Sequence, residues 1–124
     1  MSMLKLSFLL VGLVAIVCAA PSQPGDSDSQ QIATDAFFGI GSIAPKESPA
    51  YAKCGAKFRK ARITVKTYKK EIDSGSVLYN MKVDIAEPSS GSSTGRTYRN
   101  KTFKVFKART SGQLFIRENP CDSL

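Results

Sequence analysis

Two cysteines in the main part of the chain constrain its fold more than any other feature. Cys54 and Cys121 lie near the two ends of the region with regular hydrophobic patterning. Residues 6–17 form an apolar run of the length found in secretory signals, and the small residues 18–20 precede Pro21. Export would place Cys54 and Cys121 in an oxidising environment, where a disulfide between them is the default.

The predicted signal peptide spans residues 1–20, so we expect a secreted, extracellular protein. The apolar run is too short for a membrane span and has no basic flank after it, so no span is expected. The remaining chain of about 104 residues is one domain at most. A disulfide closing about 68 residues would stabilise it by roughly 4 kcal/mol in the chain-entropy model.

The composition divides the exported chain into two parts. Residues 21–33 are polar and rich in Ser, Asp, Pro and Gly, which predicts a disordered arm. The folded domain is then expected over residues 34–124. Residues 30–38 could form one short helix, and glycines and prolines between residues 39 and 49 interrupt any regular element after it.

Alternation of apolar and polar side chains predicts a mainly β fold. Strands are expected from residue 57 to 66, 77 to 86, 98 to 108 and 113 to 117, with turns at residues 72–76 and 111–112 and a flexible loop at 87–95. The clearest strand places Val77, Tyr79, Met81, Val83 and Ile85 on one face. Such a small antiparallel sheet has exposed edges unless it closes or is covered, which favours a small barrel.

The charge is strongly basic: +8 for the whole chain, and +7 once Lys5 leaves with the signal. One basic patch is predicted at Lys57, Arg59, Lys60 and Arg62. Nucleic acid is not an expected partner of an exported chain, whereas sulfated glycans would be attracted by the same long-range field. The alternative is a solvated basic face that binds nothing in particular.

The residue types for catalysis are missing from the sequence. It contains no histidine, no glycine-rich phosphate loop and no serine nucleophile motif. We therefore predict a non-enzymatic, monomeric binding protein without catalytic residues, metal or cofactor. Asn100-Lys101-Thr102 is an N-glycosylation sequon, usable if Asn100 is exposed.

Several segments in a fixed order carry a resemblance to a known family. They are residues 50–54 (AYAKC) before a basic strand, residues 70–75 (KEIDSG) before the alternating strand, and residues 112–116 (GQLFI) leading to Cys121 and Asp122. In this the chain resembles the netrin-like (NTR) domain, in particular the N-terminal domain of tissue inhibitors of metalloproteinases (TIMPs). The resemblance implies pairing of the first-strand and closing cysteines and an OB-type antiparallel barrel.

The chain departs from that family where the inhibitors bind zinc. The family opens with Cys-x-Cys-x-Pro, whereas residues 41–45 here are GSIAP, with upstream residues before them. The resemblance therefore implies a TIMP-like protein that acts by surface binding to an extracellular protein, a protease exosite or a receptor, without zinc-chelating metalloendopeptidase inhibition. The expected contact segment is Phe37, Phe38, Ile40, Gly41, Ser42 and Ile43, whose apolar residues could instead pack on the domain.

Two alternatives remain open: a glycan-binding module and a cystatin-like cysteine-protease inhibitor. Cystatins are also small, secreted and rich in antiparallel strands, and Gly75 precedes a strand as in the cystatin hairpin. The Gln-x-Val-x-Gly motif is absent, and a Pro-Trp hairpin is impossible in a chain without tryptophan. The fold would distinguish the netrin-like from the cystatin-like interpretation. A closed barrel supports the first, and a long helix held against a sheet supports the second.

Overall fold

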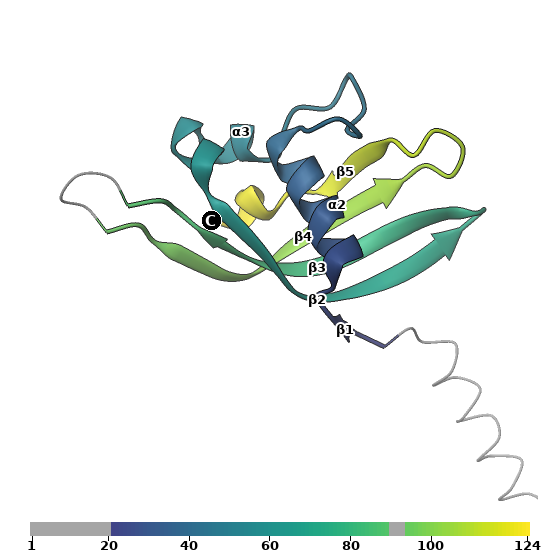
Figure 1. Ribbon diagram of the computed structural model, residues 1–124, viewed down its shortest axis with the longest axis horizontal. Coiled ribbons are helices and arrows are strands. Elements are labelled where there is room, and N and C mark those ends of the chain that lie inside the picture. Colours follow the sequence, from purple (N-terminus) through teal and green to yellow (C-terminus); the bar gives the residue numbers. More distant parts are fainter. Residues whose placement is uncertain (1–20, 90–93) are drawn as a thin grey trace, which may run out of the picture.

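A helix lies across one face of a five-stranded antiparallel sheet (Figure 1). The computed structural model describes residues 21–89 and 94–124; the predicted signal peptide lies outside the described residues. The elements in chain order are β1 (Gln23–Pro24), α2 (Ser27–Phe38), α3 (Tyr51–Cys54), the 3₁₀ helix η1 (Ala56–Lys60), β2 (Arg62–Asp73), β3 (Ser76–Ala86), β4 (Thr97–Lys107), β5 (Leu114–Glu118) and the 3₁₀ helix η2 (Pro120–Ser123).

The strands follow one another in the sheet in the order of the sequence, β1-β2-β3-β4-β5, and each pair is antiparallel. The prediction of a mainly β antiparallel fold with one short helix is confirmed. The sheet is open, however: in the described parts of the chain no pairing joins β5 to β1. The expected closure into a barrel is thereby corrected, and the physical reason is that α2 occupies the concave face of the sheet.

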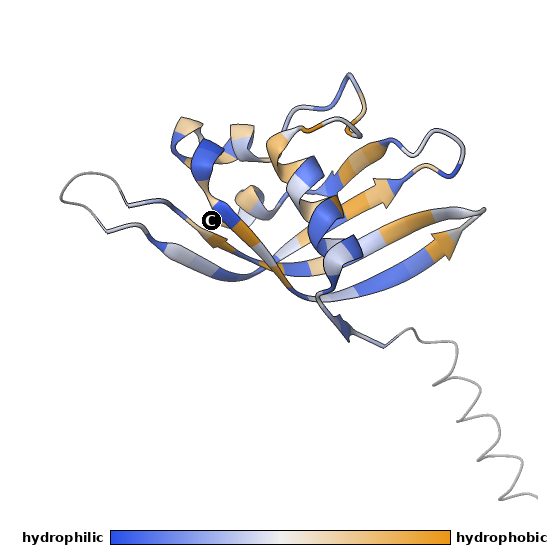
Figure 2. Cartoon of the chain, in the orientation of Figure 1, coloured by the Kyte–Doolittle hydropathy of each residue, from blue (hydrophilic) through white to orange (hydrophobic). Residues whose placement is uncertain are grey.

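Side-chain alternation works as the sequence predicts in the two central strands. Met81, Val83 and Ile85 of β3 and Phe103 and Val105 of β4 have no exposed surface. Their polar neighbours point to the other face, so that hydrophobic and hydrophilic bands succeed each other along the strands (Figure 2). The strand predicted from residue 57 begins later, because residues 56–60 form η1 and only its Phe58 is buried.

Residues 21–33 are ordered, contrary to the disordered arm predicted from their composition. They form β1 and the first half of α2. Asp26 is the N-cap of α2: its carboxylate accepts from the backbone N–H of Ser29, and the Ser29 hydroxyl accepts from the N–H of Asp26. This reciprocal capping box satisfies two backbone donors that a helix start otherwise leaves unpaired.

The buried face of α2 packs into the hydrophobic core. Ile32, Ala33, Ala36 and Phe37 are spaced to lie on one side of the helix, and all are buried. The Phe37 ring meets the Phe103 ring of β4 edge to face, with centroids 6.5 Å apart. Truncating such a buried Phe typically costs about 3–5 kcal/mol, so this contact anchors the helix on the sheet.

Polar contacts fasten the start of α2 to β2 and β3. The Gln30 amide donates to the Ile63 carbonyl at 2.6 Å and accepts from the Val65 N–H at 3.0 Å, so the side chain pairs with the edge of β2. The Tyr68 hydroxyl donates to the Asp26 carboxylate, and the Tyr79 hydroxyl donates to that of Asp28. These contacts fix the direction in which the helix crosses the sheet.

The predicted disulfide is present and joins Cys54 to Cys121, with Cα atoms 5.3 Å apart. It ties the end of α3 to η2, and so joins the segments before β2 and after β5, whereas the sequence suggested that it would clasp the first strand to the last. The buried Asn119 supports the same corner: its amide donates to the Ala50 carbonyl at 3.2 Å and accepts from the Cys121 N–H at 2.9 Å. The disulfide therefore lies close to the start of β2 and the end of β5 in the sequence.

The helix cap predicts how the fold responds to acid. The Ser29 N–H and then the Tyr68 hydroxyl lower the pKa of Asp26 from 3.8 to about 2. Because the folded-state pKa lies below that of the unfolded chain, the stabilisation is complete above about pH 4 and is lost as the pH falls toward 2. Urea unfolding at pH 5 and pH 2.5 should therefore show a smaller acid-induced loss in Asp26→Asn than in the wild type.

The matched control is Asp35→Asn, which removes one carboxylate from the other end of the same helix. This variant should lose as much stability on acidification as the wild type. An Asp26→Asn protein with the full acid sensitivity of the wild type would contradict the role given to the cap.

Candidate functional site

The end of the sheet formed by the β2–β3 hairpin and the β4–β5 loop is the candidate site. Asp73 and Ser76 form the last pair of the hairpin, and the two residues between them, Ser74 and Gly75, have φ of 52° and 84°. Positive φ at both positions is typical of a type I′ turn, which matches the twist of the strands. The sequence correctly predicts this turn, and the structure makes it the tip of a long projecting hairpin (Figure 1).

The β4–β5 loop leans against the hairpin tip. A Cβ added at Gly75 would lie 2.6 Å from a terminal guanidinium nitrogen of Arg109, so the Arg109 side chain packs directly on this glycine. The Arg109 N–H also donates to the Ser76 hydroxyl at 3.4 Å. The positive φ favours glycine at position 75, and the contact with Arg109 joins the two loops into one surface, named here the hairpin end.

An exposed apolar side chain marks the hairpin end. Ile72, just before the turn, is 78% exposed, more than the other large hydrophobic residues that the structure leaves accessible, Ile40 (52%) and Leu124 (44%). Ile72 therefore offers apolar surface that a partner protein could bury. The turn is predictable from the sequence, whereas the exposure of Ile72 is not, because an isolated apolar residue in a charged segment shows no periodicity.

The outer edge of β2 is open beside this end. β1 pairs only with Thr67 and Tyr68, and farther along β2 the Gln30 side chain pairs with the backbone of Ile63 and Val65. Within the described residues, nothing pairs with the outer edge of β2 from residue 69 to 73. The hairpin end thus offers free backbone hydrogen-bonding groups as well as an apolar side chain.

The predicted contact segment, residues 37–43, is divided by the structure. Phe37 is fully buried in the core and Phe38 packs against it, with ring centroids 5.0 Å apart. Ile43 forms a parallel bridge with Leu114 of β5. Ile40, Gly41 and Ser42 are exposed in the loop after α2. The apolar residues other than Ile40 are therefore explained by packing.

The predicted basic patch lies at the opposite end of β2 from the hairpin tip. Lys57, Arg59 and Lys60 belong to η1 and Arg62 begins β2; all four are exposed. The Lys57 ammonium lies 3.2 Å from a carboxylate oxygen of Glu87 and 5.4 Å from the centre of the Phe58 ring. Part of the charge of this patch is thus neutralised within the protein.

No protein-family model, curated protein or solved structure matches this chain. Among the described residues, no helix is long and apolar enough to cross a membrane. The same residues include no group of three or more His, Cys, Asp or Glu placed to hold a metal ion. The function therefore has to be argued from the surfaces of this structure.

Asn100 of the sequon is exposed and has a φ of 55° beside an irregularity in the β3–β4 register. Its backbone N–H donates to the Asp84 carboxylate at 3.0 Å. We predict that protein secreted from eukaryotic cells carries an N-glycan here. Mass spectrometry should show a loss of mass after enzymatic removal of N-glycans, and Asn100→Gln should remove the difference.

Thr102→Ala is a second check, because it breaks the sequon and leaves Asn100 in place. Secreted wild-type protein with the unmodified mass would contradict the prediction.

Proposed function

We propose that the protein is a secreted, non-enzymatic inhibitor of cysteine proteases that resembles cystatins in architecture. In this proposal the hairpin end binds the protease. The observation that carries the proposal is the helix α2 packed across an open antiparallel sheet, since a closed barrel is what the netrin-like interpretation would require.

The shape of the hairpin end supports binding to a cleft. β2 and β3 pair over their whole lengths up to the turn at Ser74 and Gly75, and Arg109 packs on that turn. A rigid projecting element loses little conformational entropy on binding, which favours affinity. Ile72 adds apolar surface that is exposed in the free protein and could be buried in a complex.

The disulfide lies at the opposite end of the sheet from the hairpin end. Cys54 and Cys121 join α3 to η2, far along the strands from the turn at Gly75. The covalent link and the core contacts of Phe37 therefore stabilise the sheet without occupying the hairpin end. This leaves the hairpin end free to contact another protein.

The inhibitor would be a divergent one. The turn region Ile72–Ser76 has the sequence IDSGS in place of a Gln-x-Val-x-Gly motif, and the β4–β5 loop carries Arg109 where the cystatin loop has tryptophan. The contacts would therefore come from Ile72, the Arg109 guanidinium and the free edge of β2. The Arg109 guanidinium would favour a protease with an acidic group beside its cleft.

Hydrolysis of a small fluorogenic peptide by papain tests the proposal. The protein should inhibit papain in proportion to its concentration. Ile72→Glu should raise the inhibition constant about tenfold or more, because it places a charge in an apolar contact. Ile72 is exposed, so this variant should keep the urea unfolding midpoint of the wild type.

Ile40→Glu is the matched control, since it makes the same change at another exposed isoleucine in the loop after α2. It should inhibit papain as the wild type does. Papain that keeps full activity in a molar excess of the protein would contradict the proposal. Stoichiometric inhibition of a matrix metalloproteinase with no effect on papain would contradict this proposal and also the expectation that a TIMP-like protein with GSIAP at residues 41–45 no longer inhibits metalloproteinases.

A further inference from the structure

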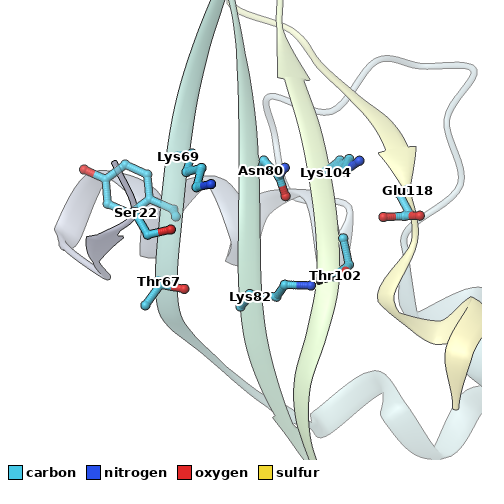
Figure 3. A pocket seen from close by; sticks show the side chains of 9 residues that line it. Ser22, Thr67, Lys69, Asn80, Lys82, Thr102, Lys104 and Glu118 are labelled. Carbon is cyan, nitrogen blue, oxygen red and sulfur yellow. Dashed lines mark hydrogen bonds between the residues drawn. The ribbon is translucent and has the colours of Figure 1, made fainter. Parts of the chain in front are cut away.

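The face of the sheet opposite α2 carries a shallow hollow of about 290 Å³ that no predicted site includes. It crosses β2, β3, β4 and β5, and Figure 3 shows polar side chains standing on each of these strands. We call it the outer groove. Its labelled lining residues are Ser22, Thr67, Lys69, Asn80, Lys82, Thr102, Lys104 and Glu118.

Strand register brings three lysines of the outer groove together. Lys69 of β2 pairs with Asn80 of β3, which pairs with Lys104 of β4, so the two lysines stand two strands apart, about 10 Å. Lys82 pairs with Thr102 in the next row, and its ammonium donates to the Thr102 hydroxyl at 2.6 Å. Lys69 and Lys104 thus share one row of the sheet, and Lys82 stands in the next row between their strands.

Among the described residues, none of these three lysines is in an ion pair with an acidic side chain. The four ion pairs in the described parts of the chain use Lys53, Lys57, Lys66 and Lys70, and none uses a lysine of the outer groove. Glu118, which pairs with Lys104 across β4 and β5, is the one acidic residue that lines the hollow. The groove therefore keeps a net positive charge toward solvent.

The other lining groups indicate what kind of anion fits. Hydroxyl and amide groups from Thr67, Thr102 and Asn80 lie among the lysines and can hydrogen-bond to sugar hydroxyls and to sulfate oxygens. Lysine ammonium groups act as point charges and do not impose the planar geometry of arginine. A flexible chain with several single-charged sulfate groups meets these conditions.

A single-stranded nucleic acid fits the outer groove less well, because it needs aromatic faces on which bases stack. Tyr68 is the aromatic residue that lines the hollow, but it is only 3% exposed and its ring stacks on Tyr79, with centroids 6.5 Å apart. Its face is not available to a base.

We propose that the outer groove binds an acidic polysaccharide through sulfate groups held by Lys69, Lys82 and Lys104. This site is distinct from the basic patch at residues 57–62 and from the hairpin end, and it does not depend on the protease-inhibitor proposal. It would retain the protein on sulfated surfaces while the hairpin end stays free.

Isothermal titration with a size-defined heparin hexasaccharide, at an ionic strength of about 0.15 M, tests the proposal. For this measurement the protein is produced in bacteria with export to the periplasm of the host, where the disulfide can form. The triple variant Lys69→Gln, Lys82→Gln, Lys104→Gln should bind roughly tenfold more weakly than the wild type, because three individually weak ion pairs are lost together.

The control triple variant, Arg59→Gln, Lys60→Gln, Arg62→Gln, removes the same number of charges from exposed positions of the basic patch. Its affinity should change less than roughly threefold, which is the effect of net charge alone. Urea unfolding midpoints of both variants should match the wild type, since all six residues lie at the protein surface and surface substitutions rarely change stability.

Three results would overturn the proposal: an equal loss in both triple variants, a larger loss in the control, or no heparin binding by the wild type. A single-stranded oligonucleotide of equal charge should bind more weakly than the hexasaccharide. Equal or tighter binding of the oligonucleotide would also overturn it.

Discussion

The packing of α2 against the inner face of the sheet is the contact on which the rest of the structure depends. Phe37 reaches Phe103 in β4, and Ala33 and Ala36 allow the helix backbone to come close to the strands. With the helix in place, the inner side chains of β3 and β4 are covered without a second layer of strands. The sheet is thereby left open, and the backbone groups at its two edges need other hydrogen-bonding partners.

The two edges of the sheet are only partly covered by hydrogen-bonding partners, and the uncovered part forms a distinct surface. The Gln30 side chain and β1 pair with part of the β2 edge, and Ile43 forms a bridge with Leu114 at the β5 edge. Beyond Tyr68, in the described chain, the edge of β2 has no partner, and there the hairpin projects with Ile72 exposed. The same geometry turns the polar residues of the strands to the outer face, where the outer groove lies. The packing of α2 on one face of the sheet thus leaves two accessible surfaces, the hairpin end and the outer groove.

The parts of the fold that depend on local patterns could be predicted from the sequence. Side-chain alternation predicted the bounds of β3 and β4 to within one residue. The turn at Ser74 and Gly75 and the disulfide could be predicted from the residue types. The start of α2 could not be predicted in this way, because its cap uses Ser29 where the common capping box has Glu or Gln. The polar composition of residues 21–33 also hid Ile32 and Ala33, which become part of the core only once the sheet is present.

The outer groove shows a second limit of sequence reasoning. A count of charges along the chain selects neighbours such as Lys57 and Lys60, whereas Lys69, Lys82 and Lys104 lie on three strands and meet only through register. Nuclear Overhauser spectroscopy of the protein in solution shows whether α2 covers an open sheet. This packing predicts cross-peaks between the ring protons of Phe37 and Phe103. Their absence, together with cross-peaks linking residues 114–118 to residues 23–24 as in a closed barrel, would contradict it.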